Sequence, residues 1–355
     1  MNVLITGATG FIGSWVAREL VARGHSVRLF VRPRSCLDNI RGIPGERFVG
    51  DITSLDSVEG AVAGCDAVVH AAAVARLRSG DRDNLLAVNE GGTRNVLGAA
   101  LRAGVRRAVF VASAGALGGT WDPVPVDERW QAPVEKSGVD YFVSKHRAEQ
   151  VALEMGRAGL PLVILRPGIA LGPGDVYHSS AGTVLMLARG KLPGYVRGGG
   201  SYCDVRDVAR AHAEALERGP GGESYLLGGY NLELGELARM VSRLSGVPMP
   251  LRVPYPLMLA FAGVREVGAR VRGQRSPISR QLIRGARRYT FLDSRKATAE
   301  FGYANRPLEE TVKDTLRWFL AHGDLEASTP ELRALGVEPP GPPSMPGPEL
   351  RERWT

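Results

Sequence analysis

The chain of 355 residues is long enough for one large α/β domain or two lobes with a substantial core. Its net charge of +8 rests on arginines that are spread along predicted helices without a nucleic-acid-binding pattern, so we expect no nucleic-acid partner. Three widely spaced cysteines and six scattered histidines argue against a disulfide framework and predict no metal site.

Two further features concern the location of the protein. The sequence begins directly with a predicted strand, so we expect no signal peptide. Its longest apolar run, residues 257–264, is far shorter than the about 20 residues that a membrane-spanning helix needs. With the few cysteines, Cys36, Cys65 and Cys203, these features predict a cytoplasmic protein.

The chain opens on a strand, a glycine turn and a helix. Residues 3–5 are an apolar run typical of a parallel strand buried on both faces, and glycines follow at every third position. Gly7 permits a tight turn, Gly10 lets the backbone approach a phosphate, and Gly13 lets helix and strand pack closely. The backbone N–H groups at the helix start then form an anion site that suits a pyrophosphate. A purely structural glycine turn is the disfavoured alternative. The predicted cofactor contacts in this stretch are Gly7, Thr9, Gly10, Phe11, Ile12 and Gly13.

The second predicted strand, residues 26–32, bears on the choice of cofactor. At its end, a dinucleotide-binding fold uses an acidic residue for the 2′-hydroxyl of NAD or an arginine for the 2′-phosphate of NADP. This strand ends in Arg32, and no carboxylate follows until Asp38. We therefore expect NADP (NADPH) as the preferred cofactor and NAD as the alternative. The alternative is that Arg32 and Arg34 are ordinary exposed loop arginines that do not contact the cofactor.

Alternating strand and helix patterns continue to residue 168 and predict a doubly wound parallel sheet of the Rossmann type. Further strands are expected at 47–50, 67–70, 108–112 and 162–165, with residues 203–229 returning to this domain. Small residues after the 67–70 strand would let a flat cofactor lie against the backbone. The further predicted cofactor contacts are Asp51, Ile52, Ala71, Ala72, Ala73, Pro167, Gly168 and Ile169. Asn89 is interpreted as a brace for the active-site backbone or, equally, as a helix-packing amide.

A smaller α/β substrate-binding lobe is expected from residues 169–202 and 230–322. Its predicted elements, in chain order, are a helix at 183–188, a glycine-rich loop at 198–200, helices at 231–247 and 255–285, a strand at 288–292 and a helix at 308–321. Residues 323–355 are expected to form an irregular Pro-rich tail. Asp175, Tyr177 and His178 are candidate substrate contacts or simply surface-loop residues.

The segment 255–288 joins an apolar start to a basic helix. The preferred interpretation is a solvated helix that covers the substrate cleft, so membrane contact is not expected. The alternative is a lid that admits a large apolar substrate and touches a membrane surface.

Several motifs in this order resemble the extended short-chain dehydrogenase/reductase superfamily, which contains the NAD-dependent epimerase/dehydratase family. The resemblance covers residues 1–322 and rests on Thr6-Gly7-Ala8-Thr9-Gly10-Phe11-Ile12-Gly13, Ser113, Tyr141-Phe142-Val143-Ser144-Lys145 and Arg166-Pro167. Within the superfamily the chain is most similar to the dihydroflavonol-4-reductase-like and hopanoid-associated epimerase-like branch. The segments similar to that branch are 113–115, 165–167, 172–175, 202–209 and 293–297, and Arg32 also fits it. The family also suggests a homodimer through the helices that carry residues 89–101 and 141–155.

The resemblance implies that Ser113, Tyr141 and Lys145 are catalytic. Tyr141 and Lys145 are four residues apart and so lie on one helix face. A lysine ammonium lowers the pKa of a neighbouring phenol, which is about 10 when free, and can also hold the nicotinamide ribose. Tyr141 would exchange a proton with the substrate oxygen, and Ser113 would hydrogen-bond the same oxygen. A surface Tyr/Lys pair and a serine that only caps a strand end are the alternatives.

Departures from the family narrow the function. Dehydratases carry an Asp-Glu pair after the active-site serine or threonine, whereas this chain has Ala114-Gly115-Ala116. Galactose-type epimerases tend to carry an Asn where this chain has Ile169. We therefore expect an NADPH-dependent oxidoreductase for a small-molecule ketone, aldehyde or secondary alcohol. An NAD(P)-dependent sugar-nucleotide epimerase is the first alternative, and a protein that binds NADP without chemistry is the second.

Overall fold

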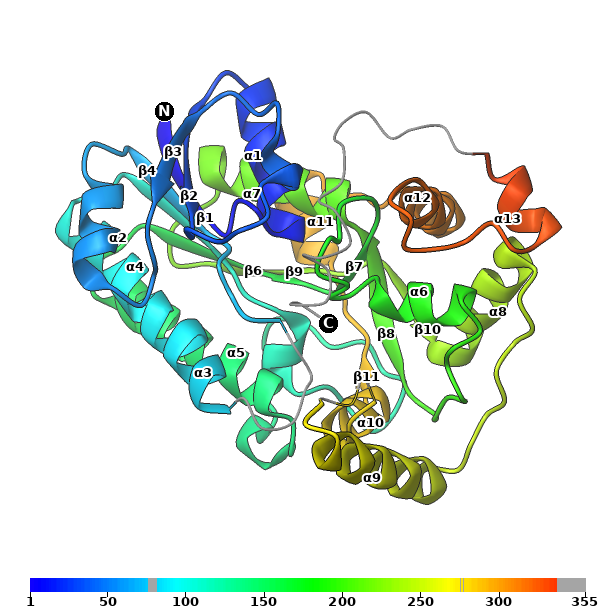
Figure 1. Ribbon diagram of the computed structural model, residues 1–355. Helices are drawn as coiled ribbons and strands as arrows, with labels where there is room; N and C mark the ends of the chain where they lie inside the picture. Colours follow the sequence, from blue (N-terminus) through cyan, green and yellow to red (C-terminus); the bar gives the residue numbers. More distant parts are fainter. Residues whose placement is uncertain (76–81, 275, 277, 337–355) are drawn as a thin grey trace.

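The computed structural model describes residues 1–75, 82–274, 276 and 278–336. In this part of the chain the larger sheet has seven parallel strands in the order β3-β2-β1-β4-β5-β6-β9 (Figure 1). The strands are β1 (Asn2–Thr6), β2 (Ser26–Val31), β3 (Glu46–Val49), β4 (Ala67–His70), β5 (Arg107–Val111), β6 (Leu162–Pro167) and β9 (Ser224–Leu227). The strand order reverses between β1 and β4, so the predicted doubly wound parallel sheet is confirmed.

Helices cover both faces of this sheet (Figure 1). One face carries α1 (Phe11–Ala22), α7 (Val205–Arg218) and α11 (Arg295–Phe301), and the other carries α2 (Leu55–Val62), α4 (Gly92–Arg102) and α5 (Asp140–Arg157). Successive side chains of β1 alternate between the two cores, with Val3 and Ile5 in the first and Leu4 in the second. Both faces are buried, which explains why β1 is continuously apolar. The shorter elements in this first part of the chain are η1 (Asp38–Ile40), α3 (Arg82–Leu86), the π-helix η2 (Ala87–Gly91), η3 (Ala114–Leu117) and η4 (Val134–Lys136).

A second, smaller sheet is built on β8 (Gly199–Asp204), which pairs with β7 (Ile169–Leu171), β10 (Tyr230–Glu233) and β11 (Tyr289–Thr290). The glycine-rich loop predicted at 198–200 is therefore wrong, because Gly199 and Gly200 are strand residues. They lie against close neighbours: a Cβ on Gly199 would meet the carbonyl oxygen of Leu232 at 2.6 Å, and one on Gly200 would meet Cδ1 of Ile169 at 2.4 Å. Glycine here indicates close packing of backbone and side chains.

The remaining helices surround the smaller sheet. They are α6 (Gly182–Ala188), α8 (Leu234–Ser245), α9 (Tyr255–Val271), α10 (Arg280–Ala286), α12 (Leu308–Ala321) and α13 (Pro330–Ala334). The helix predicted at 231–247 starts later, because residues 230–233 pair with β8 and a capping box of Glu233 and Glu236 begins α8. The strand predicted at 288–292 is reduced to two residues.

The carboxyl-terminal segment differs from the prediction over part of its length. Residues 323–355 were expected to be irregular, yet Thr329 caps α13 by accepting a hydrogen bond from the backbone N–H of Leu332 at 3.2 Å. Leu332 is buried in the core of the smaller sheet and its helices. The prediction for residues 337–355 lies outside the described residues.

Candidate active site

The glycine turn joins β1 to α1 at the point where the strand order reverses. Gly7 has a φ of +70°, and a Cβ there would lie 2.6 Å from the carbonyl carbon of Ala71 and the nitrogen of Ala72. A Cβ on Gly13 would lie 2.2 Å from the carbonyl oxygen of Gly7. Both glycines are therefore required by the fold, in the way that the sequence predicts. Gly10 precedes α1 without a side-chain cap, so the first N–H groups of the helix are available to an anion.

The other predicted cofactor contacts in and near this turn include both buried and exposed residues. Thr9 and Phe11 are buried, and Ile12 is half-buried against the core. Arg32 follows β2, the neighbour of β1, and its side chain is exposed at the carboxyl edge of the sheet. Asp51 accepts hydrogen bonds from the N–H and hydroxyl of Thr53 at 2.9 and 2.8 Å.

Residues that follow β4 and β6 complete this edge. Ala71 and Ala72 are half-buried against Gly7, and Ala73 is exposed. Ile52 is buried against Gly92. Gly168 lies between β6 and β7, and its N–H donates to the carbonyl of Leu227 in β9 at 3.0 Å. Pro167 is the last residue of β6, and Ile169 is half-buried at the start of β7. These predicted cofactor residues thus belong to segments at or next to the carboxyl ends of the strands. Tyr141 and Lys145, which are also predicted cofactor contacts, lie in α5.

The structure brings Ser113 and Tyr141 together. Ser113 follows β5, and its hydroxyl accepts a hydrogen bond from the hydroxyl of Tyr141 at 3.5 Å. The backbone N–H of Gly115 donates to the same serine oxygen at 3.1 Å and fixes it at the start of η3. Tyr141 is the second residue of α5 and is half-buried, and the pair lies at the same sheet edge as the glycine turn.

Lys145 lies one helical turn after Tyr141 and is buried. Its Nζ donates to the carbonyl oxygen of Val111 at 3.0 Å and lies 5.2 Å from the centre of the Phe110 ring. Burial lowers the pKa of Lys145 to about 8, and Glu149 acts in the opposite direction. The ammonium group is therefore held at the end of β5, beside Ser113.

The pKa of Tyr141 differs from the expectation. Burial raises this pKa above its usual value of 10, and the hydrogen bond with Ser113 opposes the change. The expected lowering by Lys145 is not found, since the lysine ammonium is directed to the carbonyl of Val111. The phenol is consequently protonated at neutral pH and suited to donate a proton.

Asn89 braces two parts of the site. Its side-chain oxygen accepts from the N–H of Val74 at 2.7 Å, while its amide nitrogen donates to the carbonyl of Val74 at 3.1 Å and to the hydroxyl of Ser144 at 2.9 Å. Asn89 lies in the π-helix η2 and connects the segment after β4 to α5, next to Lys145. Of the two interpretations of Asn89, the structure supports the brace.

A hydrogen-bonded chain lies beneath the glycine turn. Thr6 contacts Nδ1 of His70 at 2.7 Å, Nε2 of His70 contacts Thr93 at 2.9 Å, and Thr93 donates to the carbonyl of Asn89 at 2.5 Å. Burial lowers the pKa of His70 to about 3, so this imidazole is neutral. The chain fixes the ends of β1 and β4 relative to the π-helix.

Comparison with known proteins identifies the family. The model of the NAD dependent epimerase/dehydratase family matches residues 3–228. The chain belongs to this family. The family comprises NAD(P)-dependent reductases and epimerases, and the predicted resemblance is confirmed.

Three relatives of this epimerase/dehydratase family member match most of its length. A protein of Synechocystis sp. named as a candidate dihydroflavonol 4-reductase is 34% identical over 90% of this chain and 94% of that protein. Sterol demethylase protein B of Methylococcus capsulatus is 32% identical over 91% and 99%. The 4-hydroxy-2-methyl-3-oxo-4-farnesyl-3,4-dihydroquinoline-1-oxide ketoreductase of Stigmatella aurantiaca is 31% identical over 89% and 96%.

Solved structures share the fold. The crystal structure of gox2253 is 40% identical, with a TM-score of 0.79 over 92% of this chain and 99% of that one. UDP-glucose 4-epimerase of Thermus thermophilus, solved as a complex with NAD, is 25% identical, with a TM-score of 0.70 over 90% and 99%. Reductases are thus named among the relatives and an NAD complex among the structural neighbours.

Contacts between the turn and the segment after β7 were missed from the sequence. The amide of Asn39 donates to the carbonyls of Thr9 at 3.2 Å and Gly174 at 2.9 Å, and the indole of Trp15 donates to the carbonyl of Pro173 at 2.8 Å. No local signal marks Asn39, because its partners are 30 and 135 residues away.

The candidate substrate contacts in the next segment have structural partners. Asp175 is completely buried and accepts from the N–H and hydroxyl of Ser179 and from the N–H of Ala181 at 2.7–2.9 Å. It therefore caps this turn and is neither a surface-loop residue nor an exposed contact. His178 has a φ of +47°, and its ring lies 5.7 Å from the ring of Phe319 in α12. Its Nε2 lies 3.4 Å from a carboxylate oxygen of Asp324, in the segment after α12. Tyr177 is half-buried.

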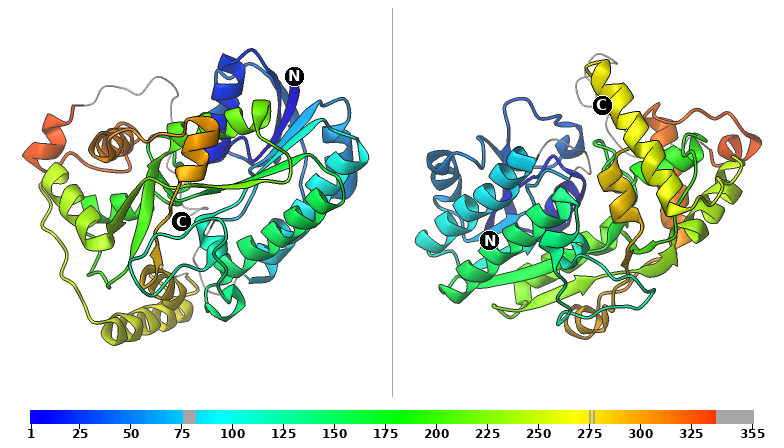
Figure 2. Two further views of the ribbon diagram at one scale, coloured as in Figure 1. Left: turned by 180° about the vertical axis from the view of Figure 1, so that it is seen from behind. Right: turned by 90° about the horizontal axis from the view of Figure 1, so that it is seen from below.

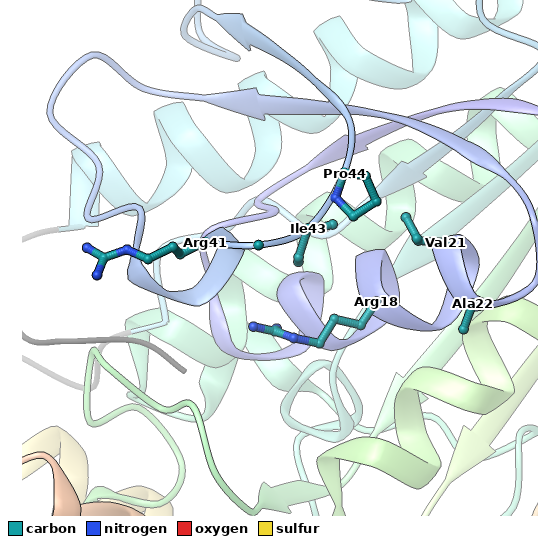
Figure 3. Close-up of a pocket in the computed structure, with 7 residues that line it drawn as sticks. Arg18, Val21, Ala22, Arg41, Ile43 and Pro44 are labelled. Atoms are coloured by element: carbon teal, nitrogen blue, oxygen red, sulfur yellow. The ribbon is translucent and has the colours of Figure 1, made fainter. Parts of the chain in front are cut away.

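A pocket of about 310 Å³ lies between α1 and the segment after η1 (Figure 3). It is lined by Arg18, Val21, Ala22, Arg41, Gly42, Ile43 and Pro44, none of which is a predicted site residue. Over the described ranges, no helix has the length and apolar content to span a membrane, and no cluster of three or more His, Cys, Asp or Glu could hold a metal ion.

Proposed function

We propose that this protein is an NADPH-dependent reductase of a small-molecule ketone or aldehyde, which also oxidises the matching secondary alcohol. The observation that carries the proposal is the contact of 3.5 Å between the hydroxyls of Tyr141 and Ser113, at the same edge of the sheet as the glycine turn. Two hydroxyls at this distance can both hydrogen-bond one substrate oxygen.

In this proposal Tyr141 is the proton donor and Ser113 orients the substrate. The raised pKa of Tyr141 keeps the phenol protonated at neutral pH, as reduction of a carbonyl requires. Ser113 donates a hydrogen bond to the carbonyl oxygen as negative charge develops on it. Tyr141 then transfers its proton to that oxygen, giving the alcohol.

Lys145 would hold the nicotinamide ribose of the cofactor, as the family resemblance implies, and would not act on the pKa of Tyr141. Its ammonium group is fixed on the carbonyl of Val111 in a buried environment. Asn89 maintains the position of α5 by its bond to Ser144, the residue before Lys145.

The residues at the sheet edge fit a nicotinamide dinucleotide. Gly7 and Gly13 leave no room for side chains, Gly10 leaves the start of α1 uncapped, and Arg32 is exposed at the end of β2. Gly7, Gly10 and the first N–H groups of α1 would hold the pyrophosphate, and Arg32 the 2′-phosphate of NADPH. When bound, the cofactor supplies the hydride.

The smaller sheet and helices α6, α8, α10 and α12 would form most of the substrate-binding lobe. A carbonyl substrate is supported by the relative named as a ketoreductase, whose name contains a farnesyl-substituted dihydroquinoline oxide. We further propose a cytoplasmic location and a homodimer through α4 and α5, which pack side by side and share the exposed pair Arg94–Glu154.

The test is NADPH oxidation, followed by absorbance, with a panel of ketones and aldehydes and with NADH in parallel. Steady oxidation of NADPH that requires both a carbonyl compound and Tyr141 supports the proposal. Tyr230→Phe is the matched control, because Tyr230 is an exposed residue of β10. Isomerisation of a nucleotide sugar without net oxidation of the cofactor would instead establish an epimerase.

A further inference from the structure

Helix α9 carries an exposed apolar stripe. Leu257, Phe261, Val264, Val267 and Val271 are 64%, 40%, 72%, 63% and 82% exposed. At about 100° per residue, these positions fall within roughly one third of the helix circumference. Isolated exposed apolar residues are ordinary, but a contiguous row on one helix marks an interaction surface.

The stripe is largely uncovered by the described part of the chain. The opposite face of α9 presents Met258 and Ala262 to a core cluster with Val196, Ile278 and Ile283. The helix lies at the lower edge of the molecule beside α10 (Figure 1) and faces the viewer when the molecule is seen from below (Figure 2). The described chain therefore buries one face of α9 and leaves the other uncovered.

Arginines border the stripe on both sides. By helical position, Arg265 and Arg272 lie along one edge and Arg270 along the other, and all three are exposed. The helix has one acidic residue, Glu266, whose carboxylate binds Arg280 at 2.7 Å. The uncovered face is thus apolar at its centre and basic at its borders.

Contrary to the expectation from the sequence, we infer that α9 docks on the surface of an anionic phospholipid bilayer, with the stripe inserted among the acyl chains and the arginines at the headgroups. Apolar residues on one face with basic residues at its borders are typical of helices that lie in the membrane interface. Each arginine near an anionic surface adds attraction that salt screens.

A second copy of the chain fits this surface less well. A helix of 17 residues is about 26 Å long and about 10 Å wide, so its exposed face offers roughly 260 Å². A stable dimer needs about 800 Å² from each partner. Pairing two such stripes would also bring arginines against arginines, whereas anionic headgroups complement them.

Helix α9 packs against α10, and α10 is hydrogen-bonded to α5, the helix that carries Tyr141. Gln281 of α10 accepts a hydrogen bond from the N–H of Asp140 at 3.0 Å and donates to the Asp140 carboxylate at 2.5 Å. Asp140 directly precedes Tyr141, so a bilayer under α9 would lie close to the site. This position favours an apolar carbonyl substrate that is dissolved in the membrane. The substrate class rests on the proposed function, whereas the docking of α9 does not.

The test is co-sedimentation of the full chain with vesicles of phosphatidylcholine alone or with 30 mol % phosphatidylglycerol. We expect binding to the anionic vesicles that weakens at least tenfold in 0.5 M salt. The double variant Val264→Gln/Val267→Gln should lose at least tenfold in partitioning. Its matched control is Val49→Gln, an exposed valine at the end of edge strand β3.

A third variant, Arg265→Gln/Arg270→Gln/Arg272→Gln, should lose the preference for anionic vesicles. The inference is overturned if the wild-type chain does not sediment with anionic vesicles, or if the valine variant binds them as the wild type does. It is also overturned if the valine variant only converts a dimer to a monomer, which would make the stripe a self-association surface. NADPH oxidation with a water-soluble carbonyl should be unchanged in all these variants, so failure of docking and failure of the proposed reaction are distinguishable.

Discussion

The glycine turn and helix α9 are both marked by regular spacing in the sequence, but the sequence determines them to different degrees. At the turn, the spacing reflects backbone constraints: Gly7 has a positive φ, and Gly13 touches the carbonyl of Gly7. In α9, two rows of apolar residues lie at helical spacing, and only the packing decides that Met258 and Ala262 face the core while Val264 and Val271 face outward. A motif set by the backbone can be read locally, whereas the assignment of a helix face requires the tertiary structure.

The largest expected effect is on catalysis, at a residue that, like the glycine turn, is identified by a local motif. We expect Lys145→Met to lower kcat by about 10²–10⁴-fold, because the buried ammonium that would position the nicotinamide ribose is removed. The measurement is steady-state NADPH oxidation, with NADPH affinity measured separately by fluorescence. Lys136→Met, in the short helix η4, is the control. A decrease in kcat of less than threefold would show that Lys145 is not catalytic.

The turn itself should be sensitive to a single methyl group. We expect Gly13→Ala to lower the free energy of unfolding by about 2–3 kcal/mol, because its Cβ would lie 2.2 Å from the carbonyl oxygen of Gly7. Gly156→Ala in α5 is the matched control: apart from the backbone of its own helix and its chain neighbours, no atom lies within 4 Å of the added Cβ, and the change should stabilise by about 0.5–1 kcal/mol. Chemical denaturation measures both, and equal effects would contradict the role of Gly13.

Arg32 tests the cofactor preference at the end of β2. We expect Arg32→Asp to lower kcat/KM for NADPH by about 10–100-fold while NADH is affected less, because a carboxylate repels the 2′-phosphate. Arg41→Asp, in the segment after η1, is the control. Equal losses for both cofactors in Arg32→Asp would show that this arginine does not read the 2′ position.

The pKa of Lys145 predicts the pH dependence of activity. Since this pKa is about 8, the ammonium is present below pH 8 and is lost as the pH rises through this value. The pKa of Tyr141 is raised, so the lysine loses its proton first. We expect kcat/KM to fall about tenfold per pH unit above pH 8. The residual activity of Lys145→Met should not show this decline, and a wild-type profile that is flat to pH 10 would contradict the assignment.

His70 gives the smallest expected effect, on stability. Its pKa is about 3 in the folded state, well below the usual 6.5 of an unfolded chain. As the pH falls from 6.5 to 5, the unfolded state therefore binds the proton and the folded state does not. Stability should decrease by about 1.4 kcal/mol per pH unit from this residue. Denaturation of His70→Gln, compared with the exposed-surface variant Arg34→Gln, should show a correspondingly smaller slope.

Much of the fold and of the candidate site could be predicted because the information is local. The seven-stranded sheet follows from apolar runs and turns, and Ser113, Tyr141 and Lys145 follow from short motifs. The contacts that hold the site together are not local. Asn39 reaches Gly174 over 135 residues, and Gly199 and Gly200 suggested a loop because their crowding by Leu232 and Ile169 is visible only in the folded chain.

The central claim is that the hydroxyl of Tyr141 donates the proton to the substrate oxygen. Its most direct test is single-turnover oxidation of bound NADPH by a carbonyl substrate, compared between the wild type and Tyr141→Phe at equal cofactor occupancy. The account predicts that NADPH binds both proteins with similar affinity and that the variant is slower by about 10³-fold or more. A variant that turns over within tenfold of the wild type would contradict it.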